Sequence, residues 1–260
     1  MSRPYIHALA LGLDPAWRRL PGDERARTGA AFAEALAADA ADDVATFTYS
    51  SIGLEAGVDL VLWRLGPSLD ALEEAAARVL RAGLGPWLTV RQSLLGIVNP
   101  SQYVAKPSEQ EQSLFEGERS RYLIVYPFTK SSEWYLTGRE TRQGIMNEHM
   151  RVGRGFPQVR QLLAYSFGLD DQDFVVAYET DELPAFEELV RALRSTEGRR
   201  STVKDSPILA AIHRPIGEIL RLLGGVEADR AASVDGPAAV DASAAADRPT
   251  PTRPLEGIPA

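Results

Sequence analysis

The sequence predicts an α+β fold in which two tandem ferredoxin-like repeats form a pseudo-symmetric β-barrel flanked by helices, a dimeric α+β barrel within one chain. The first observation behind this prediction is an internal duplication. Shifting the chain by about 114 to 116 residues aligns YSSIGLEAGVDLVLWRLGPSLDALEE, which starts at Tyr49, with YSFGLDDQDFVVAYETDELPAFEE, which starts at Tyr165. The alignment pairs Gly53 with Gly168. The second observation is that the expected helices and strands occur in the same order in both copies.

The first repeat is expected to contain four strands and two helices. Apolar residues recur every three or four positions in its helical segments and every second position in its strands. In chain order we expect a strand at Tyr5–Leu13, a helix at Asp23–Ala41, strands at Val44–Ser51 and Val58–Leu65, a helix at Ser68–Ala82 and a strand at Trp87–Val98.

The second repeat follows the same β-α-β-β-α-β order, which is that of the ferredoxin-like fold. Two sheets that each carry helices on one face can bury their free faces against each other, and this predicts the barrel. We expect a strand at Arg121–Lys130, a helix at Arg139–Gly153, strands at Gln158–Phe167 and Asp173–Glu179, a helix at Glu182–Ser195, a strand near Ser201–Ile212 and a short helix at Ile216–Leu223.

These patterns divide the chain into four parts. Residues 1–98 form the N-terminal repeat, and residues 121–226 form the C-terminal repeat. Residues 99–120 are polar, contain prolines and lack periodicity, which predicts a connector. Residues 227–260 contain no aromatic residue and are rich in Ala, Asp and Pro, which predicts a disordered tail.

Composition excludes several classes of function. The formal charge of -8 argues against nucleic acid and against an anionic membrane surface as partners. The chain has no cysteine, so disulfides, iron–sulfur clusters and a thiolate nucleophile are excluded, and any metal must be bound by His, Tyr or a carboxylate. The apolar stretch at Tyr5–Leu13 is too short for a membrane span and lacks a cleavage site, which predicts a cytoplasmic protein.

The two repeats differ chemically in their first helix, where the same offset sets Ala33 opposite His149. His149 lies on the apolar face of its helix, one turn after Ile145 and Met146. It could be a core histidine satisfied by one hydrogen bond. It could also be a metal or haem ligand, which needs a second group to fix its tautomer and orientation.

The strand Arg121–Lys130 carries an aromatic stripe, with Tyr126, Phe128 and Lys130 on one face. Such a stripe is often core with a lysine at its edge. It also suits a pocket for a large, flat, anionic ligand. In that pocket Lys130 would meet a carboxylate, and Tyr126 would supply a phenol that can donate a hydrogen bond or be oxidised.

Two further polar residues are candidates. Gln161 shares a strand face with Leu163 and Tyr165, where an amide suits a cavity. Glu197 can reach back to the helix that carries His149, although alone it is an ordinary surface carboxylate. Motifs of serine hydrolases, nucleotide-binding loops, zinc peptidases and EF-hands do not occur.

In several motifs the sequence resembles the chlorite dismutase and coproheme decarboxylase family. In chain order these are YPFTK from Tyr126, SSEWYL, MNEHM around His149, VGRGFPQVRQ, SFGLDD and AFEELVRAL. They agree with the family in order and spacing, including the steps from Trp134 to His149 and on to Gln161. The family is itself a duplicated ferredoxin-like barrel, and the resemblance implies haem as cofactor and assembly as a homopentamer.

The resemblance also implies roles for single residues. His149 would be the axial ligand of the haem iron, oriented by Glu197, and Trp134 would pack against the macrocycle. Lys130 would lie near the porphyrin edge or its propionates. Tyr103, in the segment SQYVAKP, is similar to a tyrosine that contacts a propionate in the family.

The position of Gln161 implies which branch of the family the chain is similar to. Chlorite dismutases have an arginine there, and its fixed charge can hold an oxyanion near the iron. A neutral glutamine resembles decarboxylases of one bacterial branch, in which a tyrosine matching Tyr126 carries a radical. Those enzymes use hydrogen peroxide to remove two propionate carboxyls from iron coproporphyrin III, which gives haem b. With Lys130 also present, we expect this reaction.

Alternatives stay open from the sequence. The segment between Lys130 and Trp134 is short, as in the chlorite-degrading branch, and Phe128 stands where the decarboxylases often have methionine. The chain could therefore be a haem b enzyme that degrades chlorite or acts as a peroxidase. It could also be a non-catalytic haem carrier, or an oligomeric structural protein without a cofactor.

Overall fold

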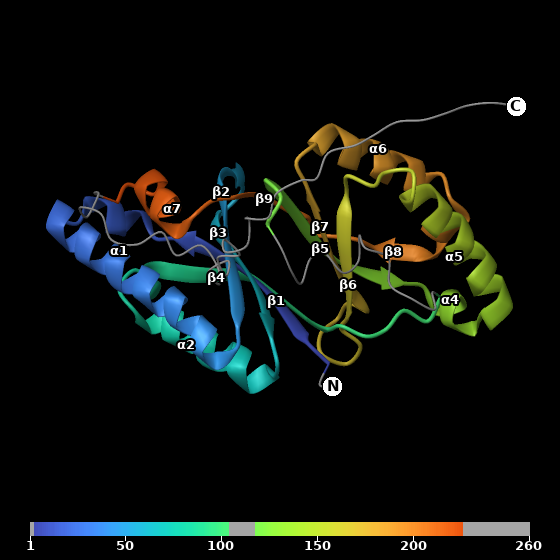
Figure 1. Cartoon of the computed structure of the whole chain (residues 1–260), viewed down its shortest axis with the longest axis horizontal. Helices are drawn as coiled ribbons and strands as arrows, with labels where there is room; N and C mark the ends of the chain where they lie inside the picture. The colour runs from blue at the N-terminus through green and yellow to red at the C-terminus, as the bar shows by residue number, and fades with distance from the viewer. Residues whose placement is uncertain (1–2, 104–117, 226–260) are drawn as a thin grey trace, which may run out of the picture.

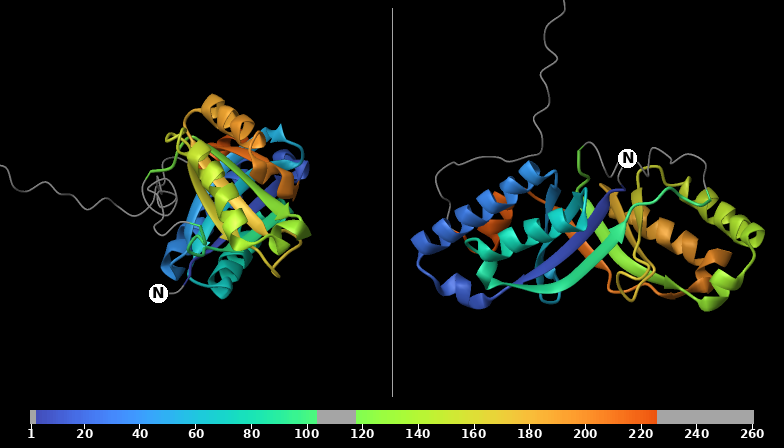
Figure 2. Two further views of the ribbon diagram at one scale, coloured as in Figure 1. Left: turned by 90° about the vertical axis from the view of Figure 1, so that its right-hand side faces the viewer. Right: turned by 90° about the horizontal axis from the view of Figure 1, so that it is seen from below.

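The computed structural model describes residues 3–103 and 118–225. They form two units side by side, each a sheet with helices on its outer side (Figure 1, Figure 2). The first unit contains β1 (Tyr5–Leu13), the 3-10 helix η1 (Pro15–Arg19), α1 (Gly22–Ala37), η2 (Ala38–Asp42), β2 (Ala45–Glu55), β3 (Val58–Gly66), α2 (Leu69–Arg81), η3 (Gly85–Trp87) and β4 (Leu88–Ile97).

The second unit repeats this order with a longer C-terminal end. It contains β5 (Tyr122–Lys130), α4 (Ser132–Leu136), α5 (Arg139–Gly153), β6 (Arg160–Tyr165), β7 (Phe174–Thr180), α6 (Leu183–Arg194), η4 (Glu197–Ser201), β8 (Thr202–Lys204), β9 (Leu209–His213) and α7 (Ile216–Leu222). The glycines paired by the sequence repeat have almost the same backbone: φ is 71° at Gly53 and 72° at Gly168. Both glycines, Gly53 within β2 and Gly168 in the turn after β6, use the left-handed region that glycine adopts without strain.

The strands close into a ring. Their order is β7-β6-β4-β1-β3-β2-β9-β5-β8, and β5 also pairs with β7, so eight antiparallel strands form a barrel with β8 attached at the edge of β5. Each repeat contributes four neighbouring strands, β4-β1-β3-β2 and β9-β5-β7-β6. This is the ferredoxin-like strand order twice, and the predicted fold class is confirmed.

The repeats meet along two seams. β2 pairs with β9, while β4 pairs with β6 only through Ile97 and Tyr165. Beside them, the Tyr49 hydroxyl hydrogen-bonds the buried carboxylate of Glu179, which also accepts a 2.8 Å hydrogen bond from Arg160 Nη2. Because Tyr49 comes from the first repeat and the other two from the second, this buried cluster ties the repeats together.

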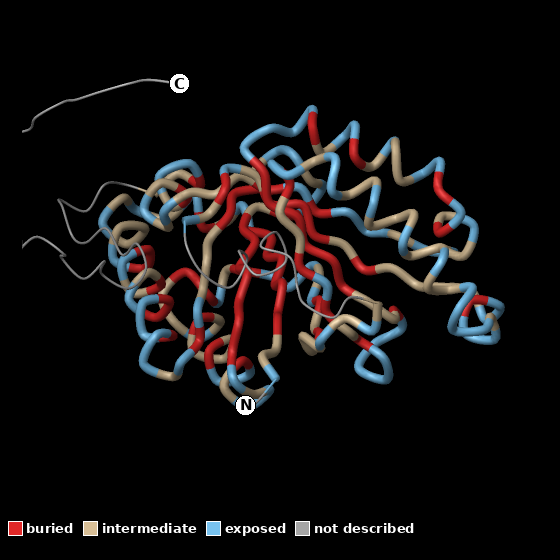
Figure 3. The backbone as a smooth tube through the Cα atoms, turned by 45° about the vertical axis from the view of Figure 1, so that its right-hand side comes forward, coloured by how far each residue is buried: buried red, intermediate tan, exposed pale blue. Residues whose placement is uncertain are grey.

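One hydrophobic core fills the barrel and is shared by both repeats. Alternate strand residues point inward, and Figure 3 shows buried residues concentrated in the central strands. Core residues with little or no exposed surface include Ile6, Ala8, Tyr49, Trp63, Leu94, Leu123, Val125, Leu162 and Val175.

The outer faces of the two sheets are covered differently. On the first sheet, side chains from η1, α1 and α7 pack directly on the strands, with Trp17 and Phe32 fully buried. α7 therefore follows the second repeat in the chain but packs on the first. On the second sheet, α5 has no buried residue. This leaves a hollow between that helix and the strands.

Two elements differ from the sequence-based expectation. The expected strand near Ser201–Ile212 is two strands, β8 and β9, because Pro207 lies between them and cannot donate to a strand ladder. The short helix α4 was not expected; it begins after Ser131 and carries Trp134.

Part of the predicted organisation lies outside the described residues. This holds for most of the connector, residues 104–117, and for the tail predicted to be disordered, residues 227–260. In the part of the chain that the structure describes, none of the helices has the length and apolar character needed to cross a membrane.

Candidate functional site

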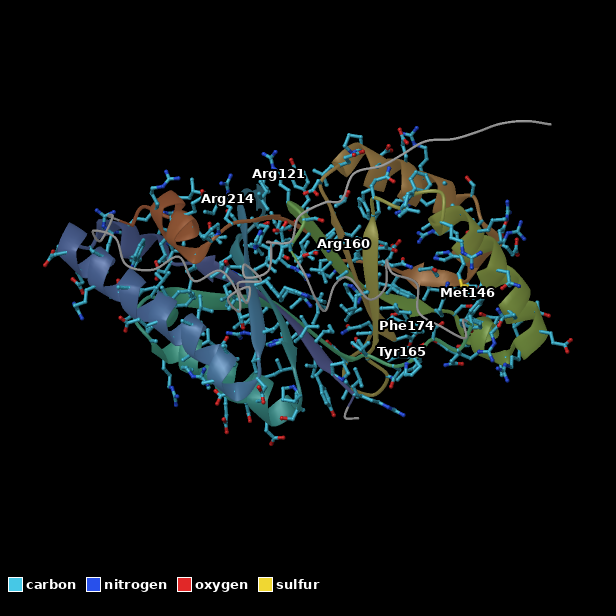
Figure 4. The ribbon with its side chains drawn as sticks, viewed as in Figure 1. Arg121, Met146, Arg160, Tyr165, Phe174 and Arg214 are labelled. Carbon is cyan, nitrogen blue, oxygen red and sulfur yellow. The ribbon has the colours of Figure 1, made fainter. Side chains whose placement is uncertain are left out.

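A cavity of about 580 Å³ lies between the outer face of the second sheet and the helices α5 and α6. This volume is in the range of small-molecule and cofactor sites. Figure 4 shows Met146 on α5 and Tyr165 and Phe174 on the facing strands, at the same side of the second repeat. All three line the cavity.

Three rows of side chains across β6, β7 and β5 form the floor. Strand register sets these rows, since alternate residues of each strand point to the same face. The rows are Gln161–Tyr178–Ile124, Leu163–Val176–Tyr126 and Tyr165–Phe174–Phe128.

One end of the floor is an aromatic surface. The rings of Phe128 and Phe174 stack at 4.7 Å between centroids, and Tyr165 and Phe167 pack around Phe174 at 5.4 and 5.1 Å. Phe167 is 48% exposed, and Tyr135 from α4 contacts its edge. Exposed aromatic rings on a flat floor suit a flat, apolar ligand.

His149 lies on the helix side of the cavity, across from this floor. It lines the cavity together with Met146 and Met150, all on one face of α5. Burial lowers the pKa of the imidazole, and the positive charge of Lys130 lowers it further. The ring is therefore neutral at pH 7. In the described part of the chain, neither ring nitrogen makes a hydrogen bond. This is not a packed core histidine.

Lys130 and Trp134 lie beside His149. Lys130 Nζ donates to the Gly198 carbonyl oxygen and to Thr202 Oγ1, both at 3.0 Å, and lies 4.8 Å from the centre of the Trp134 ring. Burial, with the charge of Arg199, lowers the pKa of Lys130 to about 8. Trp134 is 4% exposed. Both residues line the cavity, and the charge of Lys130 acts on His149.

Tyr126 occupies the middle of the floor. Its ring stacks on that of Tyr178 at 6.0 Å between centroids and 25° between planes. Burial raises the pKa of Tyr126. The phenol therefore keeps its proton at neutral pH.

Gln161 and Tyr103 also line the cavity. Gln161 lies on β6, on the sheet face that lines the cavity across from α5. It is paired with Tyr178 on β7. Tyr103 belongs to the connector, and its carbonyl oxygen accepts a 3.1 Å hydrogen bond from Gln143 Nε2 of α5. The structure thus brings together all but one of the predicted site residues.

Glu197 is the exception. Its carboxylate lies 3.4 Å from Arg200 Nη1 and is half exposed, and its backbone N–H donates to Glu148 Oε2 at 3.0 Å. Among the described residues, its carboxylate makes no hydrogen bond or ion pair with His149. The carboxylate whose charge acts on His149 is Glu148, which is one residue away on the same helix. The role of Glu197 as orienting partner stays a prediction.

Sequence reasoning did not find two residues that line the cavity, Tyr178 and Arg142. Tyr178 is paired with Ile124 and Gln161, so only strand register reveals it. Arg142 could have been found from the helix period, because it precedes Met146 by four residues and His149 by seven.

The donor set limits which metal group the cavity could hold. Among the described residues, no three or more His, Cys, Asp or Glu side chains lie close enough together to bind a metal ion. A single imidazole fits a metal whose other ligands come from an organic ring. The aromatic floor and the neutral His149 meet this requirement.

Comparisons with known proteins are consistent with this site. The family model described as chlorite dismutase matches residues 25–214. A coproheme decarboxylase from Mycolicibacterium smegmatis is 30% identical over 184 residues, which cover 65% of this chain and 79% of that protein.

Solved structures match over most of the chain. A mutant chlorite dismutase from Candidatus Nitrospira defluvii superposes with a TM-score of 0.78 at 28% identity, covering 86% of this chain and 97% of that one. The structure of chlorite dismutase from the same organism in complex with imidazole gives a TM-score of 0.77 at 28% identity, covering 85% and 95%.

Proposed function

The chain belongs to the chlorite dismutase family, and from this premise we propose that it binds iron coproporphyrin III in its cavity and converts it to haem b with hydrogen peroxide. The observation that carries the proposal is one cavity with His149 on its helix side and with Tyr126 and Gln161 on its sheet side. The similarity to a coproheme decarboxylase supports the choice of substrate.

The cavity suits this substrate. His149 would bind the iron through its neutral imidazole, since burial keeps the ring unprotonated. Trp134 and the aromatic floor would pack against the macrocycle, while Lys130 and Tyr103 would lie near its carboxylates. When bound, the iron supplies the chemistry that reduces hydrogen peroxide.

The reaction balances for each propionate. The side chain loses carbon dioxide, one proton and two electrons to become a vinyl group, and hydrogen peroxide takes two electrons and two protons to become two waters. Each propionate carboxylate thus consumes one hydrogen peroxide and one proton in total. Two rounds convert iron coproporphyrin III to haem b.

Tyr126 would carry hydrogen in this reaction. Its buried phenol is protonated at neutral pH, so oxidation removes an electron and the phenolic proton together. The oxidised ring would recover a hydrogen atom from the propionate carbon next to the macrocycle. The carboxylate then leaves as carbon dioxide with the second electron. Stacking with Tyr178 holds the Tyr126 ring in one orientation.

Gln161 favours this reaction over chlorite decomposition. A carboxamide has no charge with which to hold an oxyanion near the iron, whereas a guanidinium does. Hydrogen peroxide is uncharged at neutral pH, so its binding does not require a cationic side chain.

The test is turnover of iron coproporphyrin. Purified protein given iron coproporphyrin III and hydrogen peroxide should yield haem b, seen by mass spectrometry as the loss of two carboxyl groups. Tyr126→Phe should slow this at least about 100-fold without weakening substrate binding, because the ring remains but cannot release hydrogen.

The matched control is Tyr122→Phe, because Tyr122 is on the same strand and the same face but does not line the cavity. It should turn over like the unmodified protein. His149→Ala should remove the absorption change that accompanies iron binding. Binding of iron coproporphyrin without loss of carboxyl groups would refute the proposed reaction.

A second candidate is chlorite decomposition, which the short segment between Lys130 and Trp134 and the match to chlorite dismutase structures favour. Oxygen release after addition of chlorite separates the two functions. We expect little oxygen from the unmodified protein because of Gln161, and more from Gln161→Arg. If neither reaction turns over, the chain binds porphyrin without catalysis.

A further inference from the structure

Arg142 is a second polar residue on the helix face that carries His149. Arg142, Met146 and His149 all line the cavity from α5. At a rise of about 1.5 Å per residue, the seven residues between Arg142 and His149 correspond to about 10 Å along the helix. A porphyrin whose centre is at His149 would therefore extend its rim towards Arg142.

The guanidinium of Arg142 lacks a counter-charge in the described part of the chain. Its Nε is buried without a hydrogen-bond partner, and no carboxylate of the described residues pairs with the side chain. The two other arginines of the cavity differ. Arg199 and Arg194 both reach Asp205 Oδ2, at 2.5 and 3.7 Å. A half-buried arginine without an anion is costly unless a ligand supplies one.

Arg142 and Tyr126 also have different neighbours in the cavity. The charges that act on Tyr126 are those of Asp205, Arg194 and Arg199. The charge of Arg142 acts instead on the pKa of Tyr135 of α4. The phenol of Tyr103 acts on the same pKa. The end of the cavity at Arg142 is thus the end at which the sequence predicts a propionate contact through Tyr103.

We infer that Arg142 binds a porphyrin carboxylate that the reaction leaves in place, and that this contact orients the ring so that other carboxylates lie near Tyr126. The inference rests on the proposed function for its ligand class and adds a residue that determines orientation. The guanidinium can bind a carboxylate through two parallel hydrogen bonds, which fixes rotation of the ring as well as its position.

Iron-free porphyrins test this contact separately from iron binding and from turnover. Coproporphyrin III and protoporphyrin IX share the two propionates that the reaction retains, so Arg142→Met should weaken binding of both by a similar factor, about tenfold. Fluorescence titration of each porphyrin measures the dissociation constants. Arg142→Lys should restore part of the affinity, since it keeps the charge but loses the paired hydrogen bonds.

The matched control is Arg151→Met, which removes an exposed arginine from the same helix outside the cavity. It should bind both porphyrins like the unmodified protein. Unchanged binding by Arg142→Met, equal weakening by Arg151→Met, or weakening for coproporphyrin alone would each overturn the assignment.

If Arg142→Met does not fold by circular dichroism, Arg142→Gln takes its place with the same expectations. The two proposals can fail separately. If Arg142→Met binds porphyrins more weakly while the unmodified protein forms no haem b, this inference is sustained and the proposed reaction is refuted.

Discussion

His7 and His149 have imidazole pKa values that are lowered for similar reasons, but their surroundings differ. Burial is the main cause that lowers the pKa of each, and a neighbouring cation adds to it, Arg64 for His7 and Lys130 for His149. His7 Nε2 lies 3.0 Å from Ser93 Oγ within the packed layer of the first repeat. His149 faces the cavity instead. The neutral ring thus fills space in one repeat and leaves a lone pair for a ligand in the other.

At the same scale, His7 predicts how stability depends on pH. Its pKa is lowered from 6.5 to about 4 in the folded protein, so below pH 6.5 the unfolded chain binds a proton that the folded protein refuses. The free energy of unfolding should therefore fall by about 2 kcal/mol from pH 7 to pH 5 through this residue. Below pH 4 the folded protein also takes up the proton and the effect levels off.

Urea denaturation at pH 7 and pH 5 measures this effect. His7→Gln keeps a polar partner for Ser93 but cannot titrate, so the variant should lose less stability between the two pH values than the unmodified protein. An identical loss in both proteins would show that other groups cause the pH dependence.

At the scale of elements, the pairing between β4 and β6, where the two repeats meet, is short. One residue pair joins the strands, and Gly96 of β4 lies against Ala164 of β6. A Cβ at Gly96 would lie 2.7 Å from the Ala164 Cβ, closer than side chains pack. The absence of a side chain here lets the second repeat approach the first and close the barrel.

Gly96→Ala should push this seam apart. We expect a loss of about 1–3 kcal/mol in the free energy of unfolding, because the contact is with another strand and not with a flexible side-chain end. Gly144→Ala is the control: it lies in the middle of α5 with open space around its Cβ position, so it should be neutral or raise stability by up to about 1 kcal/mol. Thermal or urea unfolding compares the two, and equal stability of both variants would contradict the role of the seam.

At the scale of the whole molecule, the helix layers of the two repeats differ in packing within the described part of the chain. The helix layer of the first repeat is filled by Trp17 and Phe32, and by α7, which returns from the end of the second repeat. The corresponding layer of the second repeat has the loosely packed α5 and so retains the cavity. The helix layer is thus tightly packed in the first half of the barrel and hollow in the second.

The resemblance to the family also implies an assembly, and we expect a homopentamer in solution. Association would cover apolar side chains that one chain leaves exposed, among them Leu54, Leu136 and Val203. Light scattering coupled to size exclusion measures the mass directly. A monomer at all concentrations would contradict this expectation and leave the cavity of a single chain as the whole site.

The sequence alone determined the fold class, because duplication and hydrophobic period are local properties of the chain. It placed the helix Arg139–Gly153 with the bounds that the structure has, and put Tyr126, His149 and Gln161 on the faces that line the cavity. It also paired Gly53 with Gly168, which share nearly the same positive φ. Periodicity suffices for such features, since they depend on which face of an element a residue occupies.

Only the tertiary structure decided which residues meet. Strand register brought Tyr178 beside Tyr126, and closure of the barrel brought Gly96 against Ala164. The path of η4 set the Glu197 carboxylate beside Arg200. These contacts join segments far apart in the chain or depend on the path of a loop, and no periodicity encodes either, so the sequence could supply the candidates but not the distances among them.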